Sequence, residues 1–516
     1  MTNGSQEPIV GIDLGTTYSV VARLDEHGHP ATLVNAEGDR LTPSIVLFDG
    51  NDVVVGKEAM KAMTTEAEHV AECSKRDVGH RVFHKVFDGK QYPPEVIEAW
   101  ILNKLRRDAE AQVGPFEKVV ITVPAYFDEV RRKATQDAGY MAGFQVLDII
   151  NEPTAAALAF GFQQGFLNTE GSTDEPRRIL VYDLGGGTFD VTIMEIRGSE
   201  FIALATDGDV QLGGYDWDQR LVDLVAETFI REHYVDPRED PSTAARLWRE
   251  CEDAKRTLSA RSKASVACDY KGFSSRVEIS RQQYEEATQD LLDRTRFTAV
   301  QTMKAAGLEW NEIERVLLVG GSTRMPMVRQ MLTQLAGKEP DASVAADEAV
   351  AHGAALRAGL VLAKQRGERA GFRIRNVNSH SLGVVGTDPQ TQRKRNGILI
   401  RRNTPLPVTA RRVFKTSKAN QRSILVQIVE GESPSADECS QIGRCTVRDL
   451  PRNLPPKSPV EVFFHYKADG RLKVRVNVPG TDRQVETEIV RENSLPKEHL
   501  DGWRKYICGR EPRDYR

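Results

Sequence analysis

Residues 179–191 read ILVYDLGGGTFDV, and we take the rest of the chain to be organised around this stretch. An apolar run ends at Asp183, three glycines follow, and a second alternating run begins after Thr188. This pattern predicts a β-hairpin whose turn lacks side chains. Glycines let backbone N–H groups converge on an anion, and a carboxylate such as Asp183 can order the water around Mg²⁺. An ordinary hairpin with a glycine-rich turn is the alternative, and the stretch alone does not decide between them.

A second stretch of the same design lies 170 positions earlier in the chain. Residues 10–20 read VGIDLGTTYSV, in which Asp13 ends a strand and Gly15, Thr16 and Thr17 form the turn. The internal duplication of a phosphate-binding hairpin predicts two similar lobes that close on one nucleotide. A third strand, residues 315–319, ends in two glycines before a helix, which suits backbone contacts to a nucleotide sugar or phosphate.

The length, composition and net charge of the chain limit its possible functions. A chain of 516 residues is too long for one core, so two or more domains are expected. Hydrophobic residues make up 40% and charged residues 28%, and the net charge of −4 gives no reason to expect nucleic acid as the main partner. The polar start lacks the apolar core of a signal peptide, and no apolar run approaches the ~18 residues that span a bilayer. The six cysteines do not have the spacing of zinc ligands. We expect free thiols and not a disulfide between Cys439 and Cys445. A cytoplasmic protein without a membrane partner is expected.

The composition changes near residue 366. Residues 1–366 alternate strands and helices, residues 367–376 are charged and predict a linker, and residues 377–490 carry short alternating strands with Pro, Gly and Asn turns. The last pattern predicts a β-sandwich. Arginine and lysine cluster in its first half, which exposed strand positions explain better than a nucleic-acid surface. Residues 491–516 form a tail too short for another domain.

Two single residues have competing interpretations. Lys75 lies in a basic, histidine-rich run, residues 71–86, where it or Arg76 could reach a phosphate; a solvated charged face is the usual meaning of such a run. Glu152 follows a short strand and opens a helix, so it is a candidate carboxylate for the water shell of a metal. A simple helix cap is the favoured reading if that motif is taken alone.

Eight motifs in this order resemble the heat shock protein 70 (DnaK-type) chaperones. They are GIDLGTTYS (11–19), ITVPAYF (121–127), INEPTAAALAFG (150–161), YDLGGGTFDV (182–191), GDVQLGGYDWD (208–218), CEDAKRTLS (251–259), VGGSTRMP (319–326) and DEAVAHGAA (347–355). The sandwich region resembles the family's peptide-binding domain more loosely, through SLGV (381–384), RNTPLP (402–407) and VEGE (429–432).

The resemblance implies an actin-like (duplicated ribonuclease H-like) α/β ATPase domain of two lobes, followed by a β-sandwich that binds extended peptides. The implied function is that of an ATP-dependent chaperone that hydrolyses ATP to ADP and phosphate, with Mg²⁺ and K⁺ as cofactors. The implied partners are unfolded or extended peptides, a J-domain co-chaperone and a nucleotide-exchange factor. An ATP-dependent scaffold that holds one native partner, with weak coupling between the domains, is the alternative that the sequence does not exclude.

The resemblance also assigns roles to single residues. Lys75 matches the lysine that positions the attacking water and the γ-phosphate, and Pro124 and Arg132 match a relay between nucleotide state and domain docking. The catalytic set is Lys75, Glu152, Asp183, Asp13 and Thr188, and the set that organises the metal ions, Mg²⁺ through waters, is Asp13, Asp183, Asp190 and Glu152. The nucleotide set is Gly15, Thr16, Thr17, Tyr18, Gly185, Gly186, Gly187, Gly213, Gly214, Glu252, Lys255, Arg256, Ser259, Gly320, Gly321, Ser322, Arg324 and Asp347, with Arg256 and Arg324 on the two faces of the adenine. The peptide set is Val384, Phe414 and Ile424, with Thr387 and Ser417 at an arch over the peptide.

Three departures from the family pattern concern coupling between the domains. The family's leucine-rich acidic linker is replaced by Phe-Arg-Ile-Arg-Asn at 372–376, and Asp148 replaces an arginine used in linker and J-domain coupling. The chain also ends soon after the sandwich, so a helical lid is expected to be absent. A buried leucine is worth roughly 1.5–3 kcal/mol, so the loss of two predicts weak coupling, unless Arg373 or Arg375 pairs with Asp148.

Two other functions of the actin-like superfamily are alternatives to the chaperone. A small-molecule kinase would not need a β-sandwich after the nucleotide fold and should carry a catalytic base facing a substrate cleft. A filament-forming structural protein would sediment with ATP. The sequence favours the chaperone over both.

Overall fold

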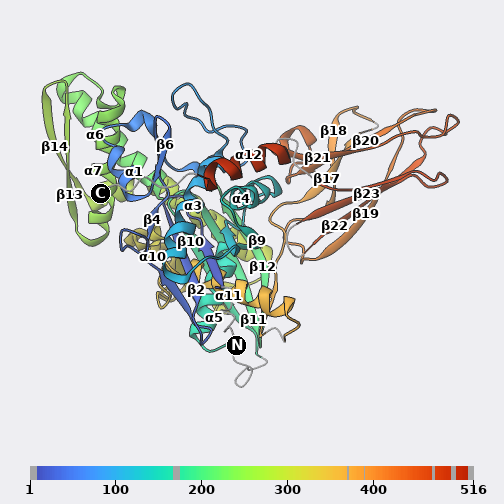
Figure 1. Ribbon diagram of the computed structural model, residues 1–516, viewed down its shortest axis with the longest axis horizontal. Coiled ribbons are helices and arrows are strands. Elements are labelled where there is room, and N and C mark those ends of the chain that lie inside the picture. Colours follow the sequence, from blue (N-terminus) through green and yellow to red (C-terminus); the bar gives the residue numbers. More distant parts are fainter. Residues whose placement is uncertain are drawn as a thin grey trace.

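The computed structural model describes residues 8–166, 175–368, 371–388, 390–467, 471–489 and 495–509. A two-lobed α/β part and a β-sandwich that projects to one side make up the molecule (Figure 1). Parts of the expected linker (369–370) and tail (491–494 and 510–516) lie outside the described residues.

The two lobes share one sheet design. In lobe I the order is β3 (Pro30–Leu33), β2 (Tyr18–Leu24), β1 (Val10–Asp13), β8 (Lys118–Val123) and β9 (Gln145–Asn151), with β4 (Thr42–Pro43) beside β2. In lobe II it is β15 (Arg315–Val319), β10 (Arg177–Leu184), β11 (Phe189–Arg197), β12 (Glu200–Asp209) and β16 (Arg373–Arg375). In lobe I the strands β1 and β2 form an antiparallel glycine hairpin, and β8 pairs with β1 in parallel. In lobe II the strands β10 and β11 form the corresponding hairpin, and β15 pairs with β10 in parallel. The duplication inferred from the two Asp-Leu-Gly turns is therefore present in the topology.

Outgrowths of each lobe flank the cleft. Lobe I carries β5 (Val46–Asp49), β6 (Asp52–Val55), β7 (Val70–Ala71), α1 (Lys57–Ala62), α2 (Ser74–Asp77), α3 (Pro94–Val113) and α4 (Glu129–Met141). Lobe II carries α6 (Gly214–His233), α7 (Pro241–Ala260), the hairpin β13 (Lys263–Tyr270) and β14 (Phe273–Ser280), α8 (Arg281–Ala287), α9 (Gln289–Ala306) and α10 (Pro326–Ala336).

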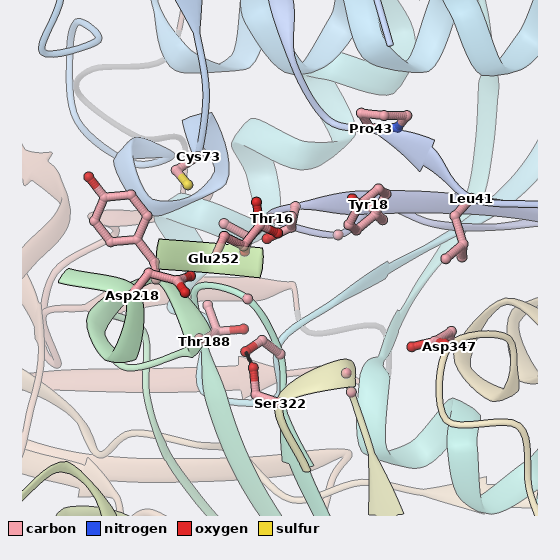
Figure 2. A pocket seen from close by; sticks show the side chains of 18 of the residues that line it. Thr16, Tyr18, Leu41, Pro43, Cys73, Thr188, Asp218, Glu252, Ser322 and Asp347 are labelled. Atoms are coloured by element: carbon pink, nitrogen blue, oxygen red, sulfur yellow. Dashed lines mark hydrogen bonds between the residues drawn. The ribbon is translucent and has the colours of Figure 1, made fainter. Parts of the chain in front are cut away.

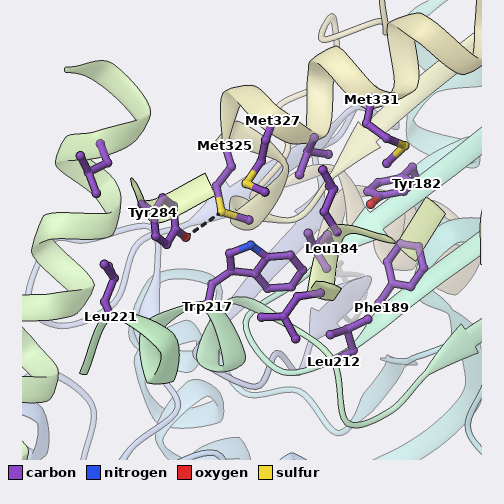
Figure 3. Packing of buried hydrophobic residues seen from close by; sticks show 14 of the residues in the cluster. Tyr182, Leu184, Phe189, Leu212, Trp217, Leu221, Tyr284, Met325, Met327 and Met331 are labelled. Atoms are coloured by element: carbon purple, nitrogen blue, oxygen red, sulfur yellow. Dashed lines mark hydrogen bonds between the residues drawn. The ribbon is translucent and has the colours of Figure 1, made fainter. Parts of the chain in front are cut away.

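A buried cluster in lobe II fixes the position of the glycine hairpin. Trp217 and Tyr182 are among its largest fully buried side chains, and they pack with Met325, just before α10, and with the α10 methionines Met327 and Met331 (Figure 3). The Tyr284 hydroxyl donates to Met325 Sδ at 3.2 Å. Because this core lies directly behind β10 and β11, it holds the turn 184–188 against the cleft.

Two helices cross between the lobes. The helix α5 (Glu152–Gln163) follows lobe I strand β9 and packs on β10 and β11, whereas α11 (Ala349–Gln365) packs on β1 and β2. Their contact requires a residue without a side chain, because a Cβ on Gly353 would lie 1.8 Å from the Ala155 carbonyl oxygen. The small residues of α11 therefore allow the close crossing that connects the two lobes.

Gly353→Ala is expected to lower the melting temperature of the protein, because overpacking a buried contact typically destabilises a protein by about 1–3 kcal/mol. The matched control is Gly502→Ala in the helix α12 (Lys497–Cys508), where nothing lies within 4 Å of the added methyl group. Differential scanning calorimetry of both variants tests this. Equal melting temperatures for Gly353→Ala and the parent would show that the crossing tolerates a side chain.

The β-sandwich has two four-stranded antiparallel sheets. One has the order β18 (Lys394–Ile400), β17 (Leu382–Thr387), β20 (Ile424–Glu430), β21 (Ser440–Val447). The other has the order β19 (Val408–Lys415), β22 (Pro459–Tyr466), β23 (Leu472–Asn477), β24 (Gln484–Glu488). The six cysteines are free, as the sequence suggested, so Cys439 and Cys445 do not form a disulfide.

The linker is docked as an edge strand of lobe II. Strand β16 pairs in parallel with β12, and Phe372 is buried with its ring 6.1 Å from that of Phe201. Strand alternation turns Arg373 and Arg375 outward, where both lie beside Glu200 at 3.7 and 3.3 Å. The expected loss of two apolar contacts therefore does not prevent docking.

Asp148 does not pair with the linker arginines. Its carboxylate binds Arg357 of α11 at 2.6 Å, within the nucleotide-binding part of the molecule. The linker residue Asn376 instead accepts a hydrogen bond from Thr154 at 3.3 Å. The alternative pairing considered from the sequence is thus replaced by separate local contacts.

The sandwich docks on both lobes. Arg402 pairs with Asp207 at 2.6 Å, and the side-chain oxygen of Asn403 accepts from the Thr206 backbone N–H at 3.0 Å. On the lobe I side, the Tyr466 hydroxyl donates to Glu129 at 2.9 Å. These contacts join the sandwich to strand β12 and to helix α4.

A buried carboxyl group at this interface makes docking sensitive to pH. Glu430 accepts from the Glu129 backbone N–H at 3.4 Å. Burial and repulsion from Asp128 and Glu129 raise its pKa well above the usual 4.5, against the attraction of Arg132. The docked state therefore binds more protons than the undocked state. Docking is most favourable below pH 4.5 and becomes less favourable as the pH rises through the raised pKa of Glu430. Burial of His380 lowers its pKa from 6.5, so His380 opposes docking only at acid pH.

Glu430→Gln is expected to remove the decline of docking as the pH rises through the raised pKa of Glu430, because glutamine fills the site without a charge. Trypsin cleavage at the linker arginines Arg373 and Arg375 measures docking, and it should slow in the variant. The exposed Glu486→Gln serves as the matched control. Faster cleavage of Glu430→Gln than of the parent at pH 8 would contradict the prediction.

The last described helix, α12 (Lys497–Cys508), lies across α3 and α4 (Figure 1). Ile507 is fully buried there, and Arg504 donates to the carbonyl oxygens of Tyr140 and Gly143 at 2.9 and 3.1 Å. This contact goes beyond the sequence prediction, which describes residues 491–516 only as a short tail.

Within the described ranges, no helix is both long enough and apolar enough to cross a membrane.

Candidate functional site

A cavity of about 840 Å³ lies between the lobes, under the two glycine hairpins. Figure 2 shows Thr16 of the first hairpin and Thr188 of the second near each other, with Ser322 beside Thr188. The residues that the sequence assigned to the nucleotide or to catalysis and that line this cavity are Asp13, Gly15, Thr16, Thr17, Tyr18, Lys75, Glu152, Asp183, Gly185, Gly186, Thr188, Gly214, Glu252, Lys255, Arg256, Ser259, Gly320, Gly321, Ser322, Arg324 and Asp347. Residues as far apart in the sequence as Asp13 and Asp347 therefore meet in one site.

Three assigned residues lie behind the lining. Gly187 and Gly213 pack against each other, since a Cβ on Gly213 would lie 2.5 Å from the Gly187 nitrogen. Asp190 accepts from the Tyr126 backbone N–H at 3.0 Å and follows the hairpin turn on β11. These residues support the cavity wall.

The hairpin glycines allow the two lobes to approach. A Cβ on Gly186 would lie 1.9 Å from Thr17 Oγ1, and one on Gly187 would lie 2.4 Å from Thr16 Cγ2. The Gly214 N–H and the Ser322 hydroxyl both donate to the Gly185 carbonyl, at 3.0 and 2.9 Å. The turn is thus held open to the cavity, where its backbone can face an anion.

A cluster of buried charges forms the floor of the cleft. Lys75 Nζ donates to Glu152 Oε1 at 2.6 Å, and the Thr122 hydroxyl donates to Asp13 at 2.9 Å. Burial and repulsion from Glu152 raise the pKa of Asp13 to about 7 and that of Asp190 to about 8. Burial alone would lower the pKa of Lys75, but attraction to Glu152 and Asp13 raises it. The floor thus carries an excess of negative charge, because the ammonium group of Lys75 faces four carboxyl groups, those of Asp13, Glu152, Asp183 and Asp190.

The excess of negative charge on this floor suits a cation. The arrangement of the side chains suits one that is bound through its water molecules better than one that the side chains coordinate directly. Among the described residues, no three His, Cys, Asp or Glu side chains are placed to hold a metal ion themselves. Asp183, Asp190 and Glu152 are buried and Asp13 is half-buried, and their carboxylate oxygens suit a Mg²⁺ ion that keeps several of its waters.

Basic residues line the opposite end of the cavity. Arg256 donates to Glu252 at 2.5 Å and to the Tyr18 hydroxyl at 3.2 Å, which joins the two lobes. Arg324 pairs with Asp347 at 2.5 Å. Both arginine side chains are more than half exposed, at 53% for Arg256 and 63% for Arg324.

The sequence interpretation missed part of the lining. Trp248, Tyr215 and Cys73 line the cavity, and the rings of Tyr215 and Trp248 lie 4.3 Å apart. Trp248 precedes Glu252 by one helical turn on α7, so helical spacing could have identified it. Tyr215 directly follows the assigned Gly214. Arg76, considered for a phosphate, instead reaches Asp216 of lobe II at 3.1 Å.

The peptide set lies in and beside the sandwich core. Val384 and Ile424 belong to its buried cluster, and Phe414 packs against that cluster from β19. The Phe414 ring borders Gly386 and Gly397, where added Cβ atoms would lie 3.8 and 3.0 Å away. Thr387 and Ser417 are both exposed.

Comparison with known families decides the identity of this arrangement. The family described as "Hsp70 protein" matches residues 9–505. The chain belongs to the Hsp70 family. Its two α/β lobes and antiparallel sandwich are the Hsp70 fold, and members of this family are ATP-dependent chaperones and ATPases that bind ATP and ADP.

Curated relatives agree over nearly the whole chain. The Chaperone protein DnaK of Halobacterium salinarum is 38% identical over 504 residues, which cover 96% of this chain and 77% of that protein. The Chaperone protein DnaK of Metamycoplasma hominis is 38% identical over 507 residues, 96% of this chain and 82% of that protein. This Hsp70 is therefore similar to DnaK proteins in both its nucleotide-binding part and its sandwich.

Proposed function

We propose that this Hsp70 binds extended apolar peptide segments in its β-sandwich and uses ATP hydrolysis in the cleft to control their release. The observation that carries this proposal is the docked linker. Strand β16 extends the lobe II sheet and leads within a few residues into a sandwich that contacts both lobes. A change in the lobes can therefore reach the peptide-binding part through backbone and side-chain contacts.

The proposed chemistry in the cleft is positioning and charge neutralisation, which phosphoryl transfer requires more than covalent help. The two glycine hairpins cradle the phosphates with their N–H groups and threonine hydroxyls, and Lys75 orients the attacking water and the γ-phosphate. Asp13, Asp183, Asp190 and Glu152 would hold hydrated Mg²⁺, together with K⁺, and these cations supply positive charge against the phosphates. Arg256 and Arg324 enclose the adenine.

In the sandwich, Val384, Phe414 and Ile424 would form the apolar pocket for a central Leu, Ile or Val of the peptide. Main-chain hydrogen bonds of an extended peptide give affinity with little dependence on sequence. The family resemblance adds a J-domain co-chaperone and a nucleotide-exchange factor as proposed partners.

Fluorescence anisotropy with a panel of unrelated peptides tests the proposal. Peptides with a central leucine should bind, the same peptides with aspartate there should not, and bound peptide should accelerate ATP hydrolysis. Binding of only one native protein, with no response to unrelated peptides, would favour an ATP-dependent scaffold. In that case the peptide-binding part of the proposal would be abandoned.

A further inference from the structure

The helix α2, which carries Lys75, is too short to be stable by itself. It has four residues, and Cys73 before it has a left-handed φ of 54° and makes no capping hydrogen bond with its side chain. A single helical turn gains little from its own hydrogen bonds. Contacts from neighbouring elements must therefore fix its orientation.

Each of its four side chains is bound to a different part of the molecule. Lys75 pairs with Glu152 in the cleft at 2.6 Å, and Arg76 crosses to Asp216 of lobe II at 3.1 Å. Asp77 accepts from His84 at 2.6 Å on the surface. Ser74 Oγ donates to Glu98 Oε1 at 2.7 Å, within the interior of lobe I.

The Ser74–Glu98 contact is the one of the four that lies in the interior of lobe I, away from both the cavity and the solvent. Neither residue lines the cavity, and both are almost fully buried, Glu98 at 2% exposure. The second carboxylate oxygen of Glu98 has no hydrogen-bond partner among the described residues. Burial raises the pKa of Glu98 to about 7, although Ser74 and Lys75 both lower it. A carboxyl group is expensive in this position, so a role beyond packing is expected of it.

The position of Ser74 explains what that role is. Ser74 directly precedes Lys75, and successive residues of a helix point about 100° apart. Holding Ser74 against α3 therefore turns Lys75 towards Glu152 and the phosphate cradle. When ATP draws Lys75 away from Glu152, the hydrogen bond to Glu98 still holds α2 in place.

We propose that Glu98 is a positioning residue for ATP hydrolysis, which acts through its hydrogen bond to Ser74 to fix the helix that presents Lys75. This inference rests on the proposed role of Lys75. Glu98 itself touches neither the nucleotide nor the reacting atoms.

The test compares Ser74→Ala, Glu98→Ala, the double variant and Glu98→Gln in the full chain. Single-turnover hydrolysis, nucleotide affinity and melting temperature are measured for each. Ser74→Ala and Glu98→Ala should hydrolyse ATP about ten- to hundredfold more slowly at unchanged nucleotide affinity, as small misplacements of a catalytic group do. The double variant should be no slower than the slower single variant, because one contact is removed in all three. Glu98→Gln keeps the acceptor oxygen and should stay within about threefold of the parent.

Thr135→Ala is the matched control, because it removes another buried hydroxyl of lobe I, which donates to the Arg131 carbonyl at 3.0 Å. It should lower the melting temperature without slowing hydrolysis. Parental hydrolysis by folded Ser74→Ala, additive losses in the double variant, or a Glu98→Gln rate as low as that of Glu98→Ala would each overturn the inference. The mild Ser74→Ala keeps the test decisive if Glu98→Ala does not fold.

Failure of this inference differs from failure of the proposed function. If Lys75→Ala abolishes hydrolysis while Ser74→Ala and Glu98→Ala do not slow it, only the proposed role of Glu98 is disproved. If Lys75→Ala hydrolyses ATP at the parental rate, the proposed role of Lys75 is disproved, and the role of Glu98, which depends on it, is disproved as well.

Discussion

Lys75→Ala is expected to reduce single-turnover ATP hydrolysis by about 10²–10³-fold, as loss of one charge that acts on a transition state does in other enzymes. Lys75 is the single ammonium group in the described carboxylate floor, where it lies 2.6 Å from Glu152. Nucleotide binding should persist, because both glycine hairpins and the residues around Arg256, which also line the cavity, are unchanged. Rapid-quench hydrolysis and nucleotide titration on the same preparation separate the two effects.

The control for this variant is Lys61→Ala, which removes an exposed lysine of lobe I that pairs only with Glu58 among its described ion pairs. It should hydrolyse ATP at the parental rate. Removing one member of a buried ion pair can destabilise a protein by about 3–5 kcal/mol, so the melting temperature of Lys75→Ala must be recorded as well. A folded Lys75→Ala protein with parental hydrolysis would disprove the assignment.

Ile424→Asp is expected to abolish peptide binding, whereas Leu425→Asp is expected to preserve it. The two residues are neighbours on β20, but Ile424 is 8% exposed in the sandwich core and Leu425 is 51% exposed on the other face. Loss of a buried apolar contact worth about 1.5–3 kcal/mol lowers affinity more than tenfold, and the new charge adds to that loss. Anisotropy titrations with a leucine-containing peptide measure both variants.

The pair distinguishes a peptide pocket from a structural core. A folded Ile424→Asp protein that binds peptide with parental affinity would rule out the pocket. Phe414→Ala provides a milder variant, since Phe414 is only partly buried and packs at the margin of the same cluster. It should weaken binding while the sandwich stays folded.

The sequence predicts the parts of the site that are local. Each Asp-Leu-Gly turn carries its own strand, carboxylate and glycines, so both hairpins were found from spacing alone. The strand 315–319 and its glycine pair were found in the same way. Lys75 and Glu152 are harder, because their contact joins residues 77 positions apart. Only the joint match to the Hsp70 motifs identified them, since each had a plausible surface or capping role by itself.

Tertiary contacts account for what the sequence interpretation missed. Tyr215 and Trp248 belong to different helices, and their stacking depends on how α6 and α7 pack. The linker arginines suggested weak docking, but strand pairing with β12 turns them to solvent and buries Phe372. Helix α12 depends on a surface formed by α3 and α4, which lie almost 400 positions earlier in the chain.

Stopped-flow release of a labelled peptide, with and without ATP, tests the central claim most directly. The docked linker and the contacts of the sandwich with both lobes predict that ATP accelerates release by about tenfold or more, which corresponds to a coupling free energy of about 1–3 kcal/mol between the two sites. An equal release rate with and without ATP, in a protein that binds both ligands, would contradict the account.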